Sequence, residues 1–318
     1  MESKVADMLD CNYRPIAFIK TDERPEDAFG PKSGGGFGCV MPYINRTIMK
    51  RIPSVFEKDT LSCPGAIVGF GYGNGYADGP LGIKFFNSFL STGLKDAEER
   101  EKYEAVANSN PEHVRGKYIG GVRIFNTLDI AKDYLENKIP IYDIDERYVV
   151  FKPLEDVEED EKVENVIFTL NALELSTLIG FDSSIRNEVS HIVTPSAAAC
   201  QAIGNYAMNE AEKDDPHAVL GLMDLMGRSE VKEPIKSEYF TYTISWDLFK
   251  KYEEKAEYSI LDGFLWDKMK SKKWLNFFYF ELLLSKLDNN LFFNNYENYS
   301  LKRINNTKHI FEIASHYF

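Results

Sequence analysis

The sequence predicts an α/β or α+β protein, a single large domain in which helices pack on a mixed β-sheet. Short β-branched or aromatic runs alternate with helical patterns along most of the 318 residues, which favours this class over all-α or all-β folds. With 44% hydrophobic and 27% charged residues, the composition is that of a globular protein. We expect this domain to cover residues 1–273, and an Asn-, Phe- and Tyr-rich segment to be appended over residues 274–318.

The first half of the chain contains most of the predicted strands. Residues 13–20 form the first, and Pro15 confines it to a sheet edge or to the start of a strand. Further apolar or β-branched runs between turn signals predict strands at 81–86, 118–125, 148–152 and 166–170. Residues 127–137 carry apolar side chains at helical spacing behind an Asn or Thr cap, which predicts a crossover helix.

The second half continues the alternation of strands and helices. Asn171 and Glu174 resemble an N-cap with an acid at the third position, so a short helix begins there and Gly180 ends it. We then expect a strand at 191–193 and a helix from Pro195 to about residue 211. Strands at 217–222 and 239–245 and helices at 247–255 and 261–270 complete the domain.

Charge and cysteine content restrict the binding partners and the cellular compartment that we expect for the protein. The net charge of −13, from 37 basic and 50 acidic residues, opposes binding to nucleic acid and to anionic membranes. Apolar stretches are shorter than the roughly 20 residues that span a bilayer, and the N-terminal residues do not resemble a secretory signal. Four cysteines without a CxxC pair indicate reduced thiols, so we expect a cytoplasmic protein. A small-molecule ligand and homo-oligomer formation are both compatible with this composition.

The segment around Cys63 is the most informative for chemistry. Pro64 is favoured in a first helical turn, which makes Ser62 or Cys63 the cap. A thiol at that position faces free N–H groups and the positive end of the helix dipole, which lower its pKa and favour a nucleophile or a metal ligand. The alternative is a small buried apolar residue that caps a helix.

Glycines occupy every second position from 69 to 75, and Gly71 and Gly73 are candidates for close backbone approach to a phosphate or a ring. The segment lacks the Gly-Lys-Ser/Thr end of a P-loop and the following helix of a dinucleotide fingerprint. A flexible turn is the alternative.

A second helix start follows Thr194 and Pro195. The Ser196 hydroxyl and the three alanines after it would let an anion or a planar ligand approach exposed N–H groups, although tight helix packing explains the alanines equally well. Cys200 lies one and a half turns further on and points either into the same cavity or into the core.

Asp224 and Arg228 are four residues apart. On a helix they would form an ion pair. In a loop, Arg228 would lie at the end of a strand and could bind a carboxylate or phosphate.

Several short segments share their order and spacing with one known family. They are 15–20 (PIAFIK), 39–41 (CVM), 63–66 (CPGA), 149–154 (VVFKPL), Cys200 and 221–228 (GLMDLMGR). From about residue 13 to 269 the chain resembles the uncharacterised archaeal and bacterial family known as domain of unknown function 169. The resemblance implies a shared fold and shared cysteine positions, and no activity. Cys11 and the residues after Lys273 fall outside the pattern.

Two hypotheses for function remain, and whether the protein is an enzyme is left open. In the first, Cys39, Cys63 and Cys200 converge on one pocket, roofed by the glycine-rich turns, and hold an iron–sulfur cluster or another soft metal, or act in thiol redox chemistry. In the second, the protein is a non-catalytic module for ligand binding or assembly. It holds a small anion with helix N-termini and Arg228, and its cysteines are structural.

Overall fold

The computed structural model describes residues 1–32, 38–186, 188–195 and 198–270. The chain divides into two units, Met1–Gly263 and Phe264–Phe318. Of the second unit, residues 264–270 are described, and they are helical. The segment expected over residues 274–318 lies outside the described residues. Everything below concerns the first unit.

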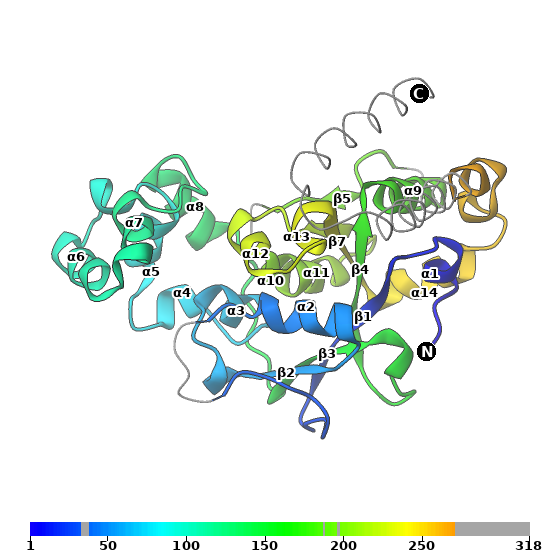
Figure 1. Cartoon of the computed structure of the whole chain (residues 1–318), viewed down its shortest axis with the longest axis horizontal. Helices are drawn as coiled ribbons and strands as arrows, with labels where there is room; N and C mark the ends of the chain where they lie inside the picture. Colours follow the sequence, from blue (N-terminus) through cyan, green and yellow to red (C-terminus); the bar gives the residue numbers. More distant parts are fainter. Residues whose placement is uncertain (33–37, 187, 196–197, 271–318) are drawn as a thin grey trace, which may run out of the picture. The chain divides into compact units, whose positions relative to one another are not determined.

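A mixed seven-stranded sheet forms the centre of the first unit, with the order β2-β3-β1-β4-β7-β6-β5. All neighbours are antiparallel except β5 and β6. The strands are β1 (Tyr13–Thr21), β2 (Ser54–Glu57), β3 (Tyr148–Pro153), β4 (Val163–Asn171), β5 (Ile192–Val193), β6 (Ala218–Gly221) and β7 (Tyr239–Ser245). The predicted class, a mixed sheet with helices packed on it, is confirmed (Figure 1).

Helices precede, connect and follow the strands. In chain order they are α1 (Lys4–Met8), α2 (Met41–Lys50), α3 (Pro64–Gly69), α4 (Gly75–Asp78), α5 (Ile83–Leu90), α6 (Arg100–Ser109), α7 (Glu112–Gly120), α8 (Leu128–Asn137), α9 (Ala172–Ser184), α10 (Ala199–Ile203), α11 (Asn205–Ala211), α12 (Leu225–Glu230), α13 (Ile235–Glu238) and α14 (Trp246–Lys255).

Side-chain alternation along the strands gives the sheet two buried faces. On β4, Ile167 belongs to the apolar core shared with α2, α3 and α10. The next residue, Phe168, points to the opposite face and packs on Phe249 of α14, with 6.3 Å between ring centroids. Successive strand residues point to opposite faces, so α2, α3 and α10 cover one face while α14 covers the other.

Local sequence signals account for several element boundaries. Asn171 caps α9 by accepting hydrogen bonds from the N–H groups of Leu173 and Glu174, and the Glu174 carboxylate accepts from the Asn171 N–H in return. Thr127 caps α8 in the same manner by accepting from the Ile130 N–H. These caps satisfy backbone donors that have no partner inside the helix, and both helix starts were predicted.

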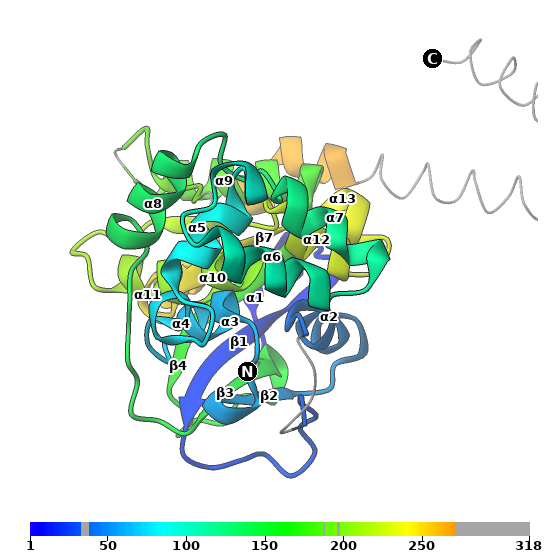
Figure 2. The ribbon, with the colours of Figure 1, turned by 90° about the vertical axis from the view of Figure 1, so that its left-hand side faces the viewer.

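Two predicted strands, 81–86 and 118–125, are wrong. Residues 83–86 of the first belong to α5, because the apolar spacing continues to Phe89 and Leu90 and so follows a helical period. In the second, α7 extends to Gly120, after which Gly121 and Arg123 adopt φ values of +67° and +56° that end any extended run. Residues 83–137 instead form a helical lobe of α5 to α8 with its own aromatic core, seen face-on in Figure 2.

Two further predicted helix boundaries are wrong. Helix α9 continues past Gly180 to Ser184. The helix expected from residue 195 to 211 is two helices, α10 and α11, separated at Gly204. A Cβ atom at Gly204 would lie 1.9 Å from the Gly69 carbonyl oxygen. The chain therefore turns where two backbones touch, and only glycine fits there.

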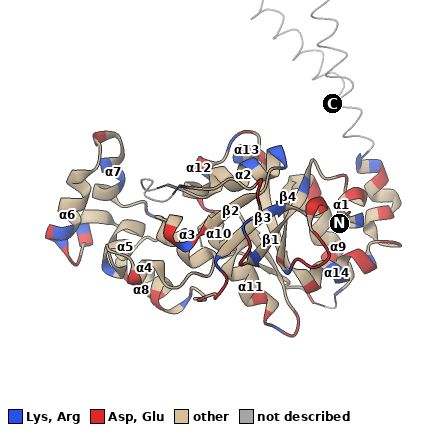
Figure 3. Cartoon of the chain, turned by 90° about the horizontal axis from the view of Figure 1, so that it is seen from below, with Lys and Arg blue, Asp and Glu red and all other residues tan. Residues whose placement is uncertain are grey.

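Surface charge is mixed. Figure 3 shows both acidic and basic residues on the lobe, with both signs on α6, and on the helices beside the sheet. Among the helices of the described residues, none has the length and apolar character needed to cross a membrane.

Candidate functional site

A cavity of about 500 Å³ lies between the helical lobe and the helices on the sheet. One side, here called the thiol wall, is formed by Cys39, Cys63, Cys200 and Asp224. The opposite side, the lobe wall, comes from α5, α7, α8 and the segment between the last two. Ligand pockets commonly have this volume, so the cavity is the main candidate site of the first unit.

Cys63 is the N-cap of α3, as predicted, with Pro64 at the first helical position. Burial raises the pKa of the Cys63 thiol, and the N–H groups of Ala66 and Gly65 lower it by a smaller amount. Neither N–H makes a hydrogen bond of normal geometry to the sulfur. The expectation of a lowered pKa is therefore wrong: the thiol is protonated because desolvation outweighs the helix start.

Cys200 lies on α10 with 4% of its surface exposed. Burial, followed by the nearby Cys63 and Cys39 thiols, raises the pKa of Cys200 well above its ordinary value. Its backbone is in tight contact with α3, because a Cβ atom at Gly69 would lie 2.9 Å from the Cys200 carbonyl oxygen. This close packing of α3 on α10 holds Cys63 and Cys200 on the same wall.

Cys39 precedes α2, and its sulfur accepts a hydrogen bond from the Met41 N–H at 3.5 Å. Burial raises the pKa of Cys39 to about 12, with a further contribution from Cys63. The structure thus places on one cavity three thiols that are far apart in sequence.

Asp224 connects the helices that form the thiol wall. Its carboxylate caps α12 by accepting from the N–H groups of Met226 (2.8 Å) and Gly227 (2.9 Å). It also accepts from the Ala199 N–H at the start of α10, at 3.3 Å. The negative charge contributes to the raised pKa values of the three wall thiols. Sequence reasoning considered Asp224 only as a partner for Arg228 and missed this role, although an Asp before a helix is a typical cap.

Arg228 lies on α12 and is not part of the cavity lining. Its guanidinium donates to the carbonyl oxygens of Leu222 and Lys236, each at 2.8 Å, and stacks on Phe240 at 4.7 Å from the ring centroid. Neither of the two roles considered from the sequence, an ion pair with Asp224 or an anion clamp, matches these contacts. Arg228 instead fixes the chain between β6 and β7.

Gly71 and Gly73 are also outside the cavity lining. Both have positive φ, of 84° and 92°. The Gly73 N–H donates to the Tyr142 carbonyl oxygen, and the Gly71 carbonyl oxygen accepts from the Ile144 N–H, each at 2.8 Å. These backbone groups are used in the turn, so the predicted turn is present and does not roof the cavity. Ser196 lies outside the described residues.

The family model described as uncharacterised ArCR (DUF169) matches residues 4–255. The chain belongs to the DUF169 family. No curated protein and no solved structure matches it. The match begins at α1 and ends at the last residue of α14, so this DUF169 fold contains the whole sheet, the helical lobe and both walls of the cavity.

The lobe wall of this DUF169 protein is predominantly aromatic. Phe86, Phe89, Tyr118, Phe125 and Tyr134 line it. Phe125 and Tyr134 pack with 4.8 Å between centroids, and Phe89 and Tyr118 with 5.2 Å. Sequence reasoning missed this wall because the lobe was interpreted partly as strands. The helical spacing of Phe86, Phe89 and Leu90 was the available signal.

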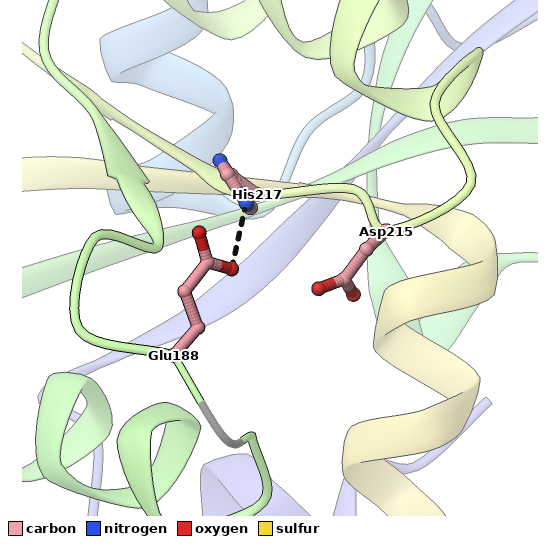
Figure 4. A group of neighbouring side chains, drawn as sticks. All are labelled: Glu188, Asp215 and His217. Carbon is pink, nitrogen blue, oxygen red and sulfur yellow. Dashed lines mark hydrogen bonds and ion pairs between the residues drawn. The ribbon is translucent and has the colours of Figure 1, made fainter.

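A second group of metal-ligand residues lies away from the cavity. Glu188, Asp215 and His217 are the one set of His, Cys, Asp or Glu in the described residues whose ligand atoms all lie within 4.8 Å of one another (Figure 4). His217 Nε2 lies 3.2 Å from Glu188, and Asp215 pairs with Arg186 at 2.7 Å. These side chains are already engaged with groups of the chain, and the two acids are solvent-exposed. We assign no metal to it.

The three wall thiols do not meet the same 4.8 Å criterion. Thiolates on one tetrahedral zinc lie roughly 3.8 Å apart, because each Zn–S bond is about 2.3 Å long. The thiol wall is therefore not arranged around a single ion.

Proposed function

We propose that this DUF169 protein binds an iron–sulfur cluster through Cys39, Cys63 and Cys200. The observation that supports this proposal is that three separate segments each bring a cysteine to one cavity wall. In a four-iron, four-sulfide cluster, each thiolate binds a different iron. The cysteine sulfurs around a cluster are therefore farther apart than those around a single zinc. This agrees with the thiol wall, whose three sulfurs do not all lie within 4.8 Å of one another.

Protonation of the thiols sets a condition on binding. Metal ligands are thiolates, so each cysteine releases its proton when it binds. Burial, the neighbouring thiols and Asp224 all favour the protonated form. A cationic centre reverses this balance, because it supplies the positive charge that the wall lacks. We therefore expect loading to become tighter as the pH rises.

In a four-iron, four-sulfide cluster, three cysteine ligands leave one iron without a protein thiolate. Metal sites used in chemistry commonly keep such an open position for substrate or water. Here the position would face the cavity and the lobe wall. Asp224 is already engaged with three N–H donors, at 2.8, 2.9 and 3.3 Å, so its part is to hold the wall and to supply negative charge.

The test is anaerobic purification and reconstitution with iron and sulfide. Wild-type protein should gain a broad visible absorbance and stoichiometric iron and sulfide. Cys39→Ser, Cys63→Ser and Cys200→Ser should each lose most of the load. Cys11→Ser is the matched control, because Cys11 is not in the cavity lining, and it should load like wild type. Failure of wild type to load, or equal loading of all four variants, would refute the proposal.

A second candidate function is a ligand-binding module with structural cysteines. One observation favours it: all three thiols pack against an apolar core, where free cysteine often acts as a small hydrophobic residue. In that case the Cys-to-Ser variants should melt at lower temperature, and wild type should retain no metal. An anion clamp at Arg228 is not part of this candidate, since that guanidinium binds backbone carbonyls.

A further inference from the structure

The cavity is larger than a metal centre at one wall requires. Its volume of about 500 Å³ equals that of roughly 17 water molecules at about 30 Å³ each. A centre bound by the cysteines would occupy the thiol wall and leave the space beside α5, α7 and α8. That remaining space is of the size that holds a small organic molecule.

The lobe wall would select a flat apolar molecule. Phe86, Phe89 and Phe125 border the space, together with Tyr118 and Tyr134. The Tyr134 hydroxyl is already hydrogen-bonded to the Tyr206 hydroxyl at 2.9 Å. Aromatic rings prefer stacked or edge-to-face partners at about 4.5 to 7 Å between centroids, so an aromatic ligand is favoured over a sugar or a peptide.

Charge is unevenly distributed around the space. Asp224 and Glu230 lie on the side of the thiol wall, and Lys117 and His113 lie on α7 opposite them. The two α7 residues are four apart and so share one helix face. Neither makes an ion pair within the described part of the chain, whereas Lys102 and Lys132 of the same lobe do. An anionic group on a ligand would be attracted to α7 and repelled by the thiol wall.

We propose that the lobe wall binds an aromatic molecule carrying one anionic group, with the anion at Lys117 and His113 and the uncharged end toward the cysteines. The proposal rests on the proposed function in one respect: the uncharged end is placed beside the open position of the metal centre. Binding itself requires only the lobe wall and α7.

Two related fluorescent probes test the two parts of this proposal. 1-Anilinonaphthalene-8-sulfonate is an aromatic anion, and N-phenyl-1-naphthylamine is nearly the same molecule without the sulfonate. Both should bind the full chain saturably at one site per chain. Val114→Trp fills the cavity from α7 and should abolish binding of both probes. Ile119→Trp is the control, since Ile119 is on the same helix, is 45% exposed and lies outside the lining. It should bind both probes as wild type does.

Charge reversal tests the orientation of the ligand. Lys117→Glu should weaken binding of the anionic probe on the order of tenfold and leave the neutral probe unchanged, because one attraction becomes a repulsion. Arg115→Glu makes the same charge change on α7 outside the lining, and both probes should bind it within about twofold of wild type. Absence of saturable one-site binding, or full binding by Val114→Trp, would overturn the aromatic site. An equal response of both probes to Lys117→Glu would overturn the anionic end.

The metal proposal and this one can fail separately. A variant with Cys39, Cys63 and Cys200 all changed to Ser should lose iron and still bind both probes. Probe binding without iron in wild type refutes the cluster and supports the aromatic site. Iron loading without probe binding refutes the aromatic site and supports the cluster.

Discussion

Two polar groups in the first unit are built in opposite ways. The first, here called the Asp182 network, consists of Asp182, Arg186, Tyr242 and Tyr252. Arg186 Nε donates to Asp182 at 2.6 Å, the Tyr242 hydroxyl donates to it at 3.3 Å, and the two tyrosine hydroxyls are 2.9 Å apart. In this network the buried charges neutralise each other. The thiol wall has one carboxylate and three raised-pKa thiols, and it faces a cavity.

The contrast separates a structural role, in the Asp182 network, from the ligand-binding role that we propose for the thiol wall. Buried charges are tolerated when they are paired and hydrogen-bonded, and the Asp182 network meets that condition with groups of its own between α9, β7 and α14. In the thiol wall, three N–H groups bind Asp224 and one, from Met41, binds the Cys39 sulfur, and no cation is among these partners. Its thiols line the cavity, and the centre that we propose there would supply the positive charge that the wall lacks. Removing one partner should therefore affect stability in the first group and binding in the second.

Arg186→Ala should have the largest effect on stability. The Arg186 side chain is 2% exposed and that of Asp182 is fully buried, so the variant leaves a buried carboxylate without its cation. Such losses reduce the free energy of unfolding by about 3 to 5 kcal/mol. Urea denaturation measures it. Arg100→Ala removes an exposed pair with Glu104 and should change stability by less than about 1 kcal/mol. If Arg186→Ala and Arg100→Ala lowered the free energy of unfolding by similar amounts, the Asp182 network would contribute no more to stability than an exposed ion pair does.

The thiol wall should give a smaller, pH-dependent effect. Folding raises the pKa of Cys39 from an ordinary 9.0 to about 12. The protonated thiol stabilises the fold fully below pH 9, and this contribution is lost as the pH rises from 9 toward 12. By linkage, the unfolding free energy should fall by about 1 kcal/mol between pH 8 and pH 10 from this residue alone.

Cys39→Ala isolates that contribution, because every other titrating group is shared with wild type. The difference in urea stability between wild type and Cys39→Ala should shrink by about 1 kcal/mol from pH 8 to pH 10. Parallel stability curves for the two proteins over this range would show that Cys39 is not buried as described.

The sequence predicted those elements of the fold that are determined by neighbouring residues. The cap at Asn171 and the strand at 13–20 depend on neighbouring residues, and both formed as expected. The run 81–86 was too short to distinguish a strand from a helix, since its period became clear only at Phe89 and Leu90. The break at Gly204 was unreadable because it arises from contact with Gly69, which is distant in sequence.

The candidate site was also predictable only where it depends on neighbouring residues. Cys63 was identified from the adjacent proline, and the shared position of the cysteines was a hypothesis about tertiary structure. The partners of Arg228 are backbone carbonyls of residues 222 and 236. No sequence motif predicts such contacts, because a carbonyl group is present at every residue. The lobe wall depends on how four helices pack together, so its aromatic residues could be assigned to the cavity only once the lobe was in place.

Asp224→Asn should have the smallest effect. The amide keeps one of the two acceptor oxygens that cap α12, replaces the other with an NH2 group, and removes the negative charge that raises the pKa of Cys63 and Cys200. The thiolate fraction at pH 8 should therefore increase, and alkylation by iodoacetamide should accelerate on the order of fivefold, the factor for about 1 kcal/mol of charge interaction. Mass spectrometry of the peptides reports each cysteine separately. Asp214→Asn removes an exposed charge outside the lining and should leave the rates unchanged. If Asp224→Asn slowed alkylation, or accelerated Cys11 as much as Cys63, its carboxylate would act through the fold rather than through the electrostatics of the thiol wall.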